Sequence, residues 1–208
     1  MRTLLARTLP DVDVTIADDG LARCGWVGRD PEYLRYHDEE WGRPLHGDRP
    51  LFEKITLEAF QSGLSWITIL RRRPGFRAAF AEFDPAVVAA FGDDDVERLM
   101  ADAGIIRNRA KIDATIANAG ALLALIDSDG PGALDRLVWD FAPPPRPETE
   151  RPRSLGDLAP ITPESTALSK ELKKRGFRFF GPTTAYALMQ SGGLVDDHVV
   201  GCFRAAGE

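Results

Sequence analysis

Helical spacing of the apolar residues is the feature that most limits the fold of this chain. Apolar side chains recur three and four positions apart through most of the sequence after residue 30, and we find no strand pattern and no internal repeat. This spacing places them on one face of each helix. The sequence therefore predicts an all-α fold, with helices within residues 30–37, 51–70, 87–100, 111–126, 162–174 and 183–190.

Helix boundaries are indicated by residue types that cap helices. Asp30-Pro31-Glu32 and Thr162-Pro163-Glu164 each place a side-chain acceptor just before a proline at the first helical position. Ser62-Gly63 predicts a turn that divides residues 51–70 into two helices. Gly192-Gly193 predicts the end of the last helix.

The domain organisation follows from where this spacing is missing. Residues 1–21 show no clean periodicity, so we expect a flexible N-terminal extension, followed by a single helical domain over residues 22–208. Residues 143–164 are rich in proline and predict an irregular connection.

The composition is that of an ordinary globular protein, with 44% hydrophobic and 28% charged residues. No run approaches the roughly 20 apolar residues that a membrane helix needs. The N-terminal residues lack the long apolar core and the small-residue cleavage site of a secretion signal. We therefore expect a monomeric cytoplasmic protein that does not bind membranes.

The charge distribution is more informative than the net charge of −6, which by itself argues mildly against a nucleic-acid partner. Basic residues gather in three clusters, each after an apolar helical run. Any one cluster is typical of a solvated surface, but three suggest attraction to a phosphate backbone. The clusters are Arg71, Arg72, Arg73 and Arg77; Arg107, Arg109 and Lys111; and Lys170, Lys173, Lys174, Arg175 and Arg178.

Both cysteines and two of the three histidines lie in pairs at opposite ends of the chain. His198 and Cys202 are four residues apart, so a helical turn would bring them to one face, and Cys24 precedes His37 by thirteen residues. Two thiolates and two imidazoles would complete a tetrahedral zinc site without an open position, which is typical of structural zinc. Spacing alone equally allows buried free thiols with unrelated histidines. A disulfide is disfavoured in the cytoplasm.

Residues 172–188 predict two helices joined by a tight glycine turn. Such a hairpin can direct backbone N–H groups and a helix N-terminus at a DNA phosphate. The pattern is weak alone, but residues 181–185 read GPTTA and are followed about ten residues later by VDDH at 195–198. This combination resembles the hairpin and following aspartate of the helix-hairpin-helix DNA glycosylases.

Longer motifs narrow the resemblance. They are RCGWVGRDPEYLRYHDEEWG at 23–42, LFEKITLEAFQSGLSWITIL at 51–70, DAGIIRNRAKI at 102–112, ALSKELKKRGFRFFG at 167–181 and LVDDHVVGC at 194–202. In order and spacing they resemble the type I, zinc-containing 3-methyladenine DNA glycosylases. The resemblance implies a helix-hairpin-helix glycosylase fold that excises 3-methyladenine from alkylated double-stranded DNA and releases it as the free base.

The resemblance also implies the metal and its ligands. One structural Zn²⁺ per chain would be held by Cys24, His37, His198 and Cys202, joining the N- and C-terminal regions. The remaining histidine, His46, matches no ligand, and we expect it on the surface.

A base pocket is implied by the same match. Tyr36 and Trp66 would flank the extruded base, with Trp26 and Tyr33 lining the pocket, whereas Trp41 keeps the ordinary interpretation of a core residue. Glu58 lies in an apolar helical context and would accept hydrogen bonds from the modified base, favouring positive charge as the bond breaks. We assign it recognition and a catalytic part.

The DNA contacts implied by the resemblance are few. Gln61, Gly63 and Leu64 occupy the turn where the family places its wedge, and Leu64 would fill the gap left by the flipped nucleotide. Lys174 and Gly181, in the second hairpin, would contact the backbone.

Two positions bear on the chemistry. Thr183 stands where strand-cutting relatives carry a lysine, which predicts a monofunctional hydrolase. Asp196 aligns with the superfamily's catalytic aspartate, where this family commonly has asparagine. Asp196 either stabilises the sugar cation or caps a helix, and we favour the cap.

Two alternative functions stay open: a glycosylase of broader alkyl-purine range, and a zinc-stapled DNA-binding module without catalysis.

Overall fold

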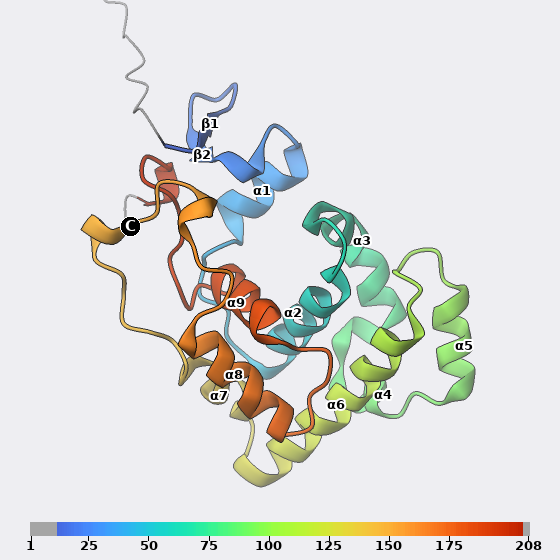
Figure 1. Cartoon of the computed structure of the whole chain (residues 1–208). Coiled ribbons are helices and arrows are strands. Elements are labelled where there is room, and N and C mark those ends of the chain that lie inside the picture. The colour runs from blue at the N-terminus through green and yellow to red at the C-terminus, as the bar shows by residue number, and fades with distance from the viewer. Residues whose placement is uncertain (1–11, 206–208) are drawn as a thin grey trace, which may run out of the picture.

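The computed structural model describes residues 12–205, and helices make up most of them (Figure 1). The predicted all-α class is confirmed, with short 3₁₀ turns between several helices. The longer elements are β1 (Val14–Ile16), β2 (Ala22–Cys24), α1 (Pro31–Glu39), α2 (Asp48–Gln61), α3 (Trp66–Ala79), α4 (Pro85–Ala89), α5 (Asp93–Ala101), α6 (Arg109–Asp129), α7 (Ala133–Trp139), α8 (Pro163–Lys174) and α9 (Pro182–Ser191).

Helix α2 is the centre of the fold. It packs against α3, α6, α7 and α9, and its residues from Leu51 to Phe60 are buried except for Glu53. A helix that is apolar on nearly all sides is stable only inside a core. The polar residues Lys54 and Glu58, which α2 carries into that core, therefore stand out.

Capping explains where the helices begin. The Asp30 carboxylate accepts from the backbone N–H groups of Glu32 and Tyr33, and Thr162 accepts from Ser165, as the sequence predicted. The predicted helix at 87–100 is instead two helices, α4 and α5. The break falls at Phe91-Gly92. Gly92 is the N-cap of α5, and its N–H donates to Asp95. The first turn of α5 is acidic, and negative charges stabilise a helix N-terminus.

The prediction that no strand is present was wrong for a short N-terminal hairpin. Strands β1 and β2 pair antiparallel, with Val14 opposite Cys24 and Ile16 opposite Ala22. Three-residue strands are too short for an alternating pattern to be recognised. Residues 12–21, which we expected in an extension, thus join the structure. The expectation of flexibility for residues 1–11 lies outside the described residues.

The two ends of the described chain meet in a second, smaller core. It contains Cys24, Tyr36 and Trp41 from the N-terminal region and Val199 and Cys202 from the C-terminal one. Figure 1 shows the C-terminal end beside β1, β2 and α1. Within residues 12–205, no helix is both long enough and apolar enough to cross a membrane.

Candidate active site and metal centre

An aromatic pocket of about 250 Å³ lies between α1, α2, α3 and α9. The structure brings together all the residues predicted for the base pocket. The lining residues of the pocket are Trp26, Tyr33, Tyr36, Trp41, Glu58, Gln61, Trp66, Leu155, Ala187, Gln190 and Ser191.

Packing fixes the aromatic walls. Trp66 is the first residue of α3, and its ring centroid lies 5.6 Å from that of Tyr36. The Tyr33 hydroxyl accepts a hydrogen bond from the backbone N–H of Ile67 at 3.0 Å, which ties α1 to the start of α3. The indole N–H groups of Trp26 and Trp66 are buried and have no hydrogen-bond partner in residues 12–205. Buried donors without partners are unusual in native proteins, and both belong to residues that line the pocket.

Glu58 is the acidic group of the pocket. It is 4% exposed, and the Ser191 hydroxyl donates to its Oε1 at 2.9 Å. Burial raises the pKa of Glu58, while the nearby Lys54 ammonium and the Ser191 hydrogen bond oppose that rise. The pocket therefore presents one carboxylate oxygen with a committed partner and a second that a ligand can use.

The turn between α2 and α3 is tight and exposed. The Leu64 N–H donates to the Gln61 carbonyl, Gly63 has a φ of +85° that favours glycine, and Leu64 is 39% exposed. Lys111 supports the turn from below, donating to the carbonyls of Phe60 and Ser62 at 3.0 and 2.9 Å. Lys111 is thus a buried structural lysine and does not belong to a basic surface cluster.

Helices α8 and α9 form the predicted hairpin. Asn118 of α6 holds its turn by exchanging two hydrogen bonds with the backbone of Arg178. Gly181 is the exposed N-cap of α9, and Lys174 is exposed at the end of α8. Basic side chains and a helix N-terminus therefore share one surface. Ion pairs join three of the four arginines at 71–77 to Asp30, Glu40 and Glu53, and Arg175 of the hairpin likewise pairs with Asp129 and Glu171.

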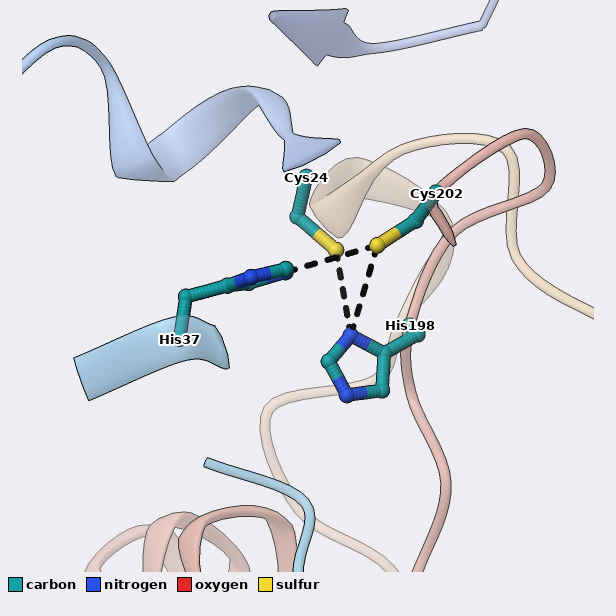
Figure 2. A group of neighbouring side chains, drawn as sticks. All are labelled: Cys24, His37, His198 and Cys202. Carbon is teal, nitrogen blue, oxygen red and sulfur yellow. Dashed lines mark hydrogen bonds between the residues drawn. The ribbon is translucent and has the colours of Figure 1, made fainter. Parts of the chain in front are cut away.

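The four predicted metal ligands converge in one buried group (Figure 2). Cys202 Sγ lies 3.4 Å from His37 Nε2, and His198 Nδ1 lies 3.6 Å from both sulfurs. Tetrahedral zinc, with bonds of about 2.3 Å to sulfur and about 2.0–2.1 Å to nitrogen, would place sulfur and nitrogen roughly 3.5–3.6 Å apart. The arrangement therefore fits a single tetrahedral ion.

The surroundings of these ligands also fit a metal. His37 Nδ1 is hydrogen-bonded to Asp38 at 2.9 Å, and Arg23 in turn pairs with Asp38. A carboxylate behind a histidine is the usual outer partner of a metal ligand. The contact between the two thiols raises the pKa of Cys24 and lowers that of Cys202.

The loop that carries His198 and Cys202 differs from its prediction. We expected a helical turn, but residues 198–202 form an irregular turn in which Cys202 N–H donates to the Val199 carbonyl at 3.0 Å. Gly201 has a φ of +83°, which a right-handed helix does not allow. The turn still brings both ligands to the same point.

A model of the methyladenine glycosylase family matches residues 26–205. The chain belongs to this family. The family resemblance inferred from the motifs is thus confirmed.

Relatives in this family extend over nearly the same length. DNA-3-methyladenine glycosylase 1 of Escherichia coli (strain K12) is 51% identical over 182 residues, covering 88% of this chain and 96% of the relative. A solved structure of 3-methyladenine DNA glycosylase I is 48% identical over 88% of this chain and 98% of its own, with a TM-score of 0.82. The structure of a single-residue variant of 3-methyladenine DNA glycosylase I in complex with 3-methyladenine is 31% identical in sequence. The match covers 89% of this chain and 98% of that protein, with a TM-score of 0.81. The predicted glycosylase fold is confirmed.

Two sequence-based roles of this family member change in the structure. Trp41 is buried, as a core residue is, but it also lines the pocket and contacts His198 edge-on with ring centroids 4.7 Å apart. Asp196 caps no helix, because none starts there. Instead it accepts from the His198 N–H at 3.1 Å and from Arg151 at 2.9 Å, outside the lining of the pocket.

The structure adds residues that sequence reasoning missed. Asp197, next to Asp196, is buried and accepts from Tyr186, Gln190 and Arg146. Its bond to Gln190 helps to hold that side chain at the pocket. Ser191 had no signal, because its partner Glu58 is 133 residues away. Lys54, four residues before Glu58 in an apolar helix, was visible in the sequence but was not singled out. His46 is exposed, as predicted.

Proposed function

We propose that this chain is a DNA-3-methyladenine glycosylase that hydrolyses the N-glycosidic bond of 3-methyladenine in alkylated double-stranded DNA. The observation that carries the proposal is the pocket in which the tilted rings of Tyr36 and Trp66, with centroids 5.6 Å apart, line the same wall space as the buried Glu58. The relatives' names agree with it, and one related structure is a complex with 3-methyladenine.

The aromatic walls suit the substrate base. A base extruded from the duplex loses its stacking, at a cost of a few kcal/mol, and rings such as Tyr36 and Trp66 restore it. Adenine methylated at N3 is cationic in DNA, so the ring faces also attract it through their quadrupoles. Normal bases are neutral and gain only the stacking.

Glu58 supplies selectivity at the edge of the base. Its free carboxylate oxygen accepts a hydrogen bond from the modified base, and its charge favours the cationic form until the bond breaks. Because the alkylated base leaves as a neutral molecule, strong acid catalysis is unnecessary.

The exposed hairpins would hold the DNA. We assign Leu64, on the turn formed with Gln61 and Gly63, to the gap left by the flipped nucleotide. The N-terminus of α9 at Gly181 and the ammonium of Lys174 would contact phosphates. These contacts fix the position of the duplex without reading its sequence.

The reaction is a hydrolysis only. A strand-cutting glycosylase needs an amine that forms a Schiff base, and at the start of α9 this chain has Thr183, whose exposed side chain carries only a hydroxyl. Water therefore captures the sugar. The exposed Asp196 could assist only through its charge.

The metal centre has a structural role. Cys24, His37, His198 and Cys202 would bind one Zn²⁺ per chain, which supplies stability and leaves no position for water. A reduced thiol pair and a DNA substrate agree with a cytoplasmic location. We propose that the protein acts as a monomer.

The deciding experiment is chromatography of the bases released from methylated double-stranded DNA by the purified protein. We expect free 3-methyladenine from methylated DNA and no base from untreated DNA. Binding of DNA without release would replace this proposal with that of a DNA-binding module. Release of several alkylated purines at similar rates would indicate the broader range.

A further inference from the structure

Lys54 is a buried cation that the proposed chemistry does not use. It is 8% exposed and lies on α2 four residues before Glu58, so the two side chains share a face of the helix. Its ammonium lies 3.5 Å from the Tyr36 hydroxyl. It also lies over the rings of Tyr36 and Trp66, 5.2 and 5.3 Å from their centroids.

Lys54 and Glu58 face different cavities. Glu58 lines the aromatic pocket, whereas Lys54 lines a second cavity of about 330 Å³ behind it, and Ser191 lies on the boundary of both. A cavity of that size with charged walls can hold several waters. Water in the second cavity can therefore hydrate the Lys54 ammonium, while the Glu58 carboxylate faces the base in the aromatic pocket.

We propose that Lys54 is a positioning residue that keeps Glu58 in its carboxylate form and sets the two rings that flank the base. This inference rests on the proposed function for the part that Glu58 plays with a ligand. The charge state of Glu58 in the free protein does not depend on the proposed function.

The other charges around Lys54 and Glu58 are largely paired with one another, so Lys54 is the cation that acts on the Glu58 carboxylate. The neighbouring groups are Tyr36 on α1, Glu40 directly after α1, Arg73 on α3, Ser191 on α9 and Glu53 on α2. Arg73 is paired with Glu40, and Arg77 with Glu53, so these charges largely cancel. In residues 12–205 Lys54 has no carboxylate within 4.0 Å, which leaves its field to act through space on Glu58.

The contacts with the two aromatic rings also favour the charged form of Lys54. An ammonium behind two aromatic faces is stabilised by their quadrupoles, which offsets part of its burial. Burial lowers the pKa of Lys54, and the negative charge of Glu58 opposes that. Each charge thus opposes the effect of burial on the other, and the Ser191 hydroxyl adds a hydrogen bond to the carboxylate.

The test is a pH titration of the Glu58 carboxyl carbon by ¹³C NMR in the free protein, with the signal assigned by its loss in Glu58→Gln. In Lys54→Met the titration should move to higher pH, because burial then acts without the opposing cation. Lys54→Arg should restore the wild-type titration. Lys173→Met, which removes an exposed lysine of α8 that lines neither cavity, should leave it unchanged.

Binding of free 3-methyladenine provides the second readout. Towards the acid end of the range, Lys54→Met should bind about tenfold more weakly than wild type, as expected from losing one neighbouring charge. The difference should shrink as the pH rises. Lys54→Gln serves in place of the methionine variant if that protein does not fold.

The proposal is overturned if Glu58 titrates at the same pH with and without the Lys54 charge. That result is distinct from failure of the proposed function, which would show as no base released from methylated DNA by the wild-type protein. The titration decides the role of Lys54 in either case.

Discussion

Single residues in the pocket are placed by contacts between elements that are distant in the chain. Glu58 is buried at the centre of α2, and its nearest hydrogen-bond donor, Ser191, comes from the end of α9. A carboxylate in such a position is costly unless its partners are complete. Because one oxygen remains for a ligand, the effect of changing Glu58 should fall on the base rather than on DNA in general.

Glu58→Gln is expected to weaken binding of free 3-methyladenine by about 2 kcal/mol, roughly thirtyfold, the usual scale for a hydrogen bond to a charged group. Binding of undamaged DNA should hardly change. Calorimetry with the free base and fluorescence anisotropy with DNA would measure the two. Glu53→Gln is the matched control, since Glu53 pairs with Arg77 and does not line the aromatic pocket. Equal losses in both assays would assign Glu58 a structural role.

Asp196→Asn is expected to retain most of the excision activity. Asparagine can still accept from the His198 N–H, and the ion pair with Arg151, in which the Asp196 carboxylate is about half exposed, contributes about 0–1 kcal/mol. Single-turnover excision of 3-methyladenine would measure it. A loss of about a thousandfold, near 4 kcal/mol, would instead give Asp196 a direct part in catalysis.

Asp197→Asn provides the contrast. Asp197 is buried, whereas its partner Arg146 is exposed and can be hydrated, so removing the Asp197 charge should lower the free energy of unfolding by about 1–3 kcal/mol, the scale of hydrogen bonds to a buried charged group. Thermal unfolding would show this, and an unchanged Tm would contradict the inferred burial of Asp197.

Among the elements, the α2–α3 turn is exposed at Leu64 and the α8–α9 hairpin is exposed at Gly181, and both are proposed to contact DNA. The α2–α3 turn depends on Lys111 from α6, and the α8–α9 turn depends on Asn118 from the same helix. One long helix therefore supports both turns from within the core. This common support should keep their spacing constant when DNA binds.

Leu64→Ala should weaken binding to DNA that contains an abasic-site analogue while leaving free-base binding unchanged, because the side chain is exposed and fills only the gap in the duplex. We expect a loss of about 1–3 kcal/mol, comparable to the cost of removing a buried leucine's contacts. Ile161→Ala, another exposed apolar residue, is the control. An equal effect of both substitutions would contradict the wedge.

The α8–α9 hairpin also predicts the product. With Thr183 at the start of α9, the strand should remain intact and carry an abasic site. Borohydride treatment during the reaction should trap no covalent protein–DNA adduct, as judged by denaturing electrophoresis. A trapped adduct that maps to a lysine of the hairpin would show lyase chemistry and contradict the monofunctional assignment.

At the scale of the whole molecule, the metal centre, the hairpin β1–β2 and the proline-rich loop hold the two ends of the chain together. Arg151 in that loop donates to Asp196 and to the His198 carbonyl, and Pro152 accepts from the Val200 N–H. Trp26 and Tyr36 each lie within two residues of a proposed metal ligand. Loss of the metal should therefore disturb the pocket as well as the fold.

Cys202→Ser is expected to lower metal content and thermal stability together. Loss of a metal is among the largest effects of a single substitution, and each kcal/mol lowers Tm by about 2–4 °C in a chain of this size. Metal analysis and calorimetry on protein purified without chelator would measure both. His46→Ala should keep the metal, because His46 is exposed and outside the cluster. Absence of zinc from the wild-type protein would refute the assignment.

What the sequence by itself determined is mainly local. Asp30, Thr162 and the glycines beyond α9 set helix boundaries because capping acts between neighbours in the chain. The metal ligands were named by the resemblance to known motifs, because their spacing alone left buried free thiols equally possible. The resemblance to known motifs supplied the pocket aromatics.

Only the tertiary structure decided which side chains meet across the fold. Ser191 and Lys54 around Glu58, Trp41 on the pocket wall and the burial of Asp197 beside an exposed Asp196 all depend on how α1, α2 and α9 pack. Neighbouring aspartates look alike in a sequence, but packing buries one and leaves the other in water. The short strands were hidden for the same reason, because their pairing depends on a partner strand rather than on a pattern within three residues.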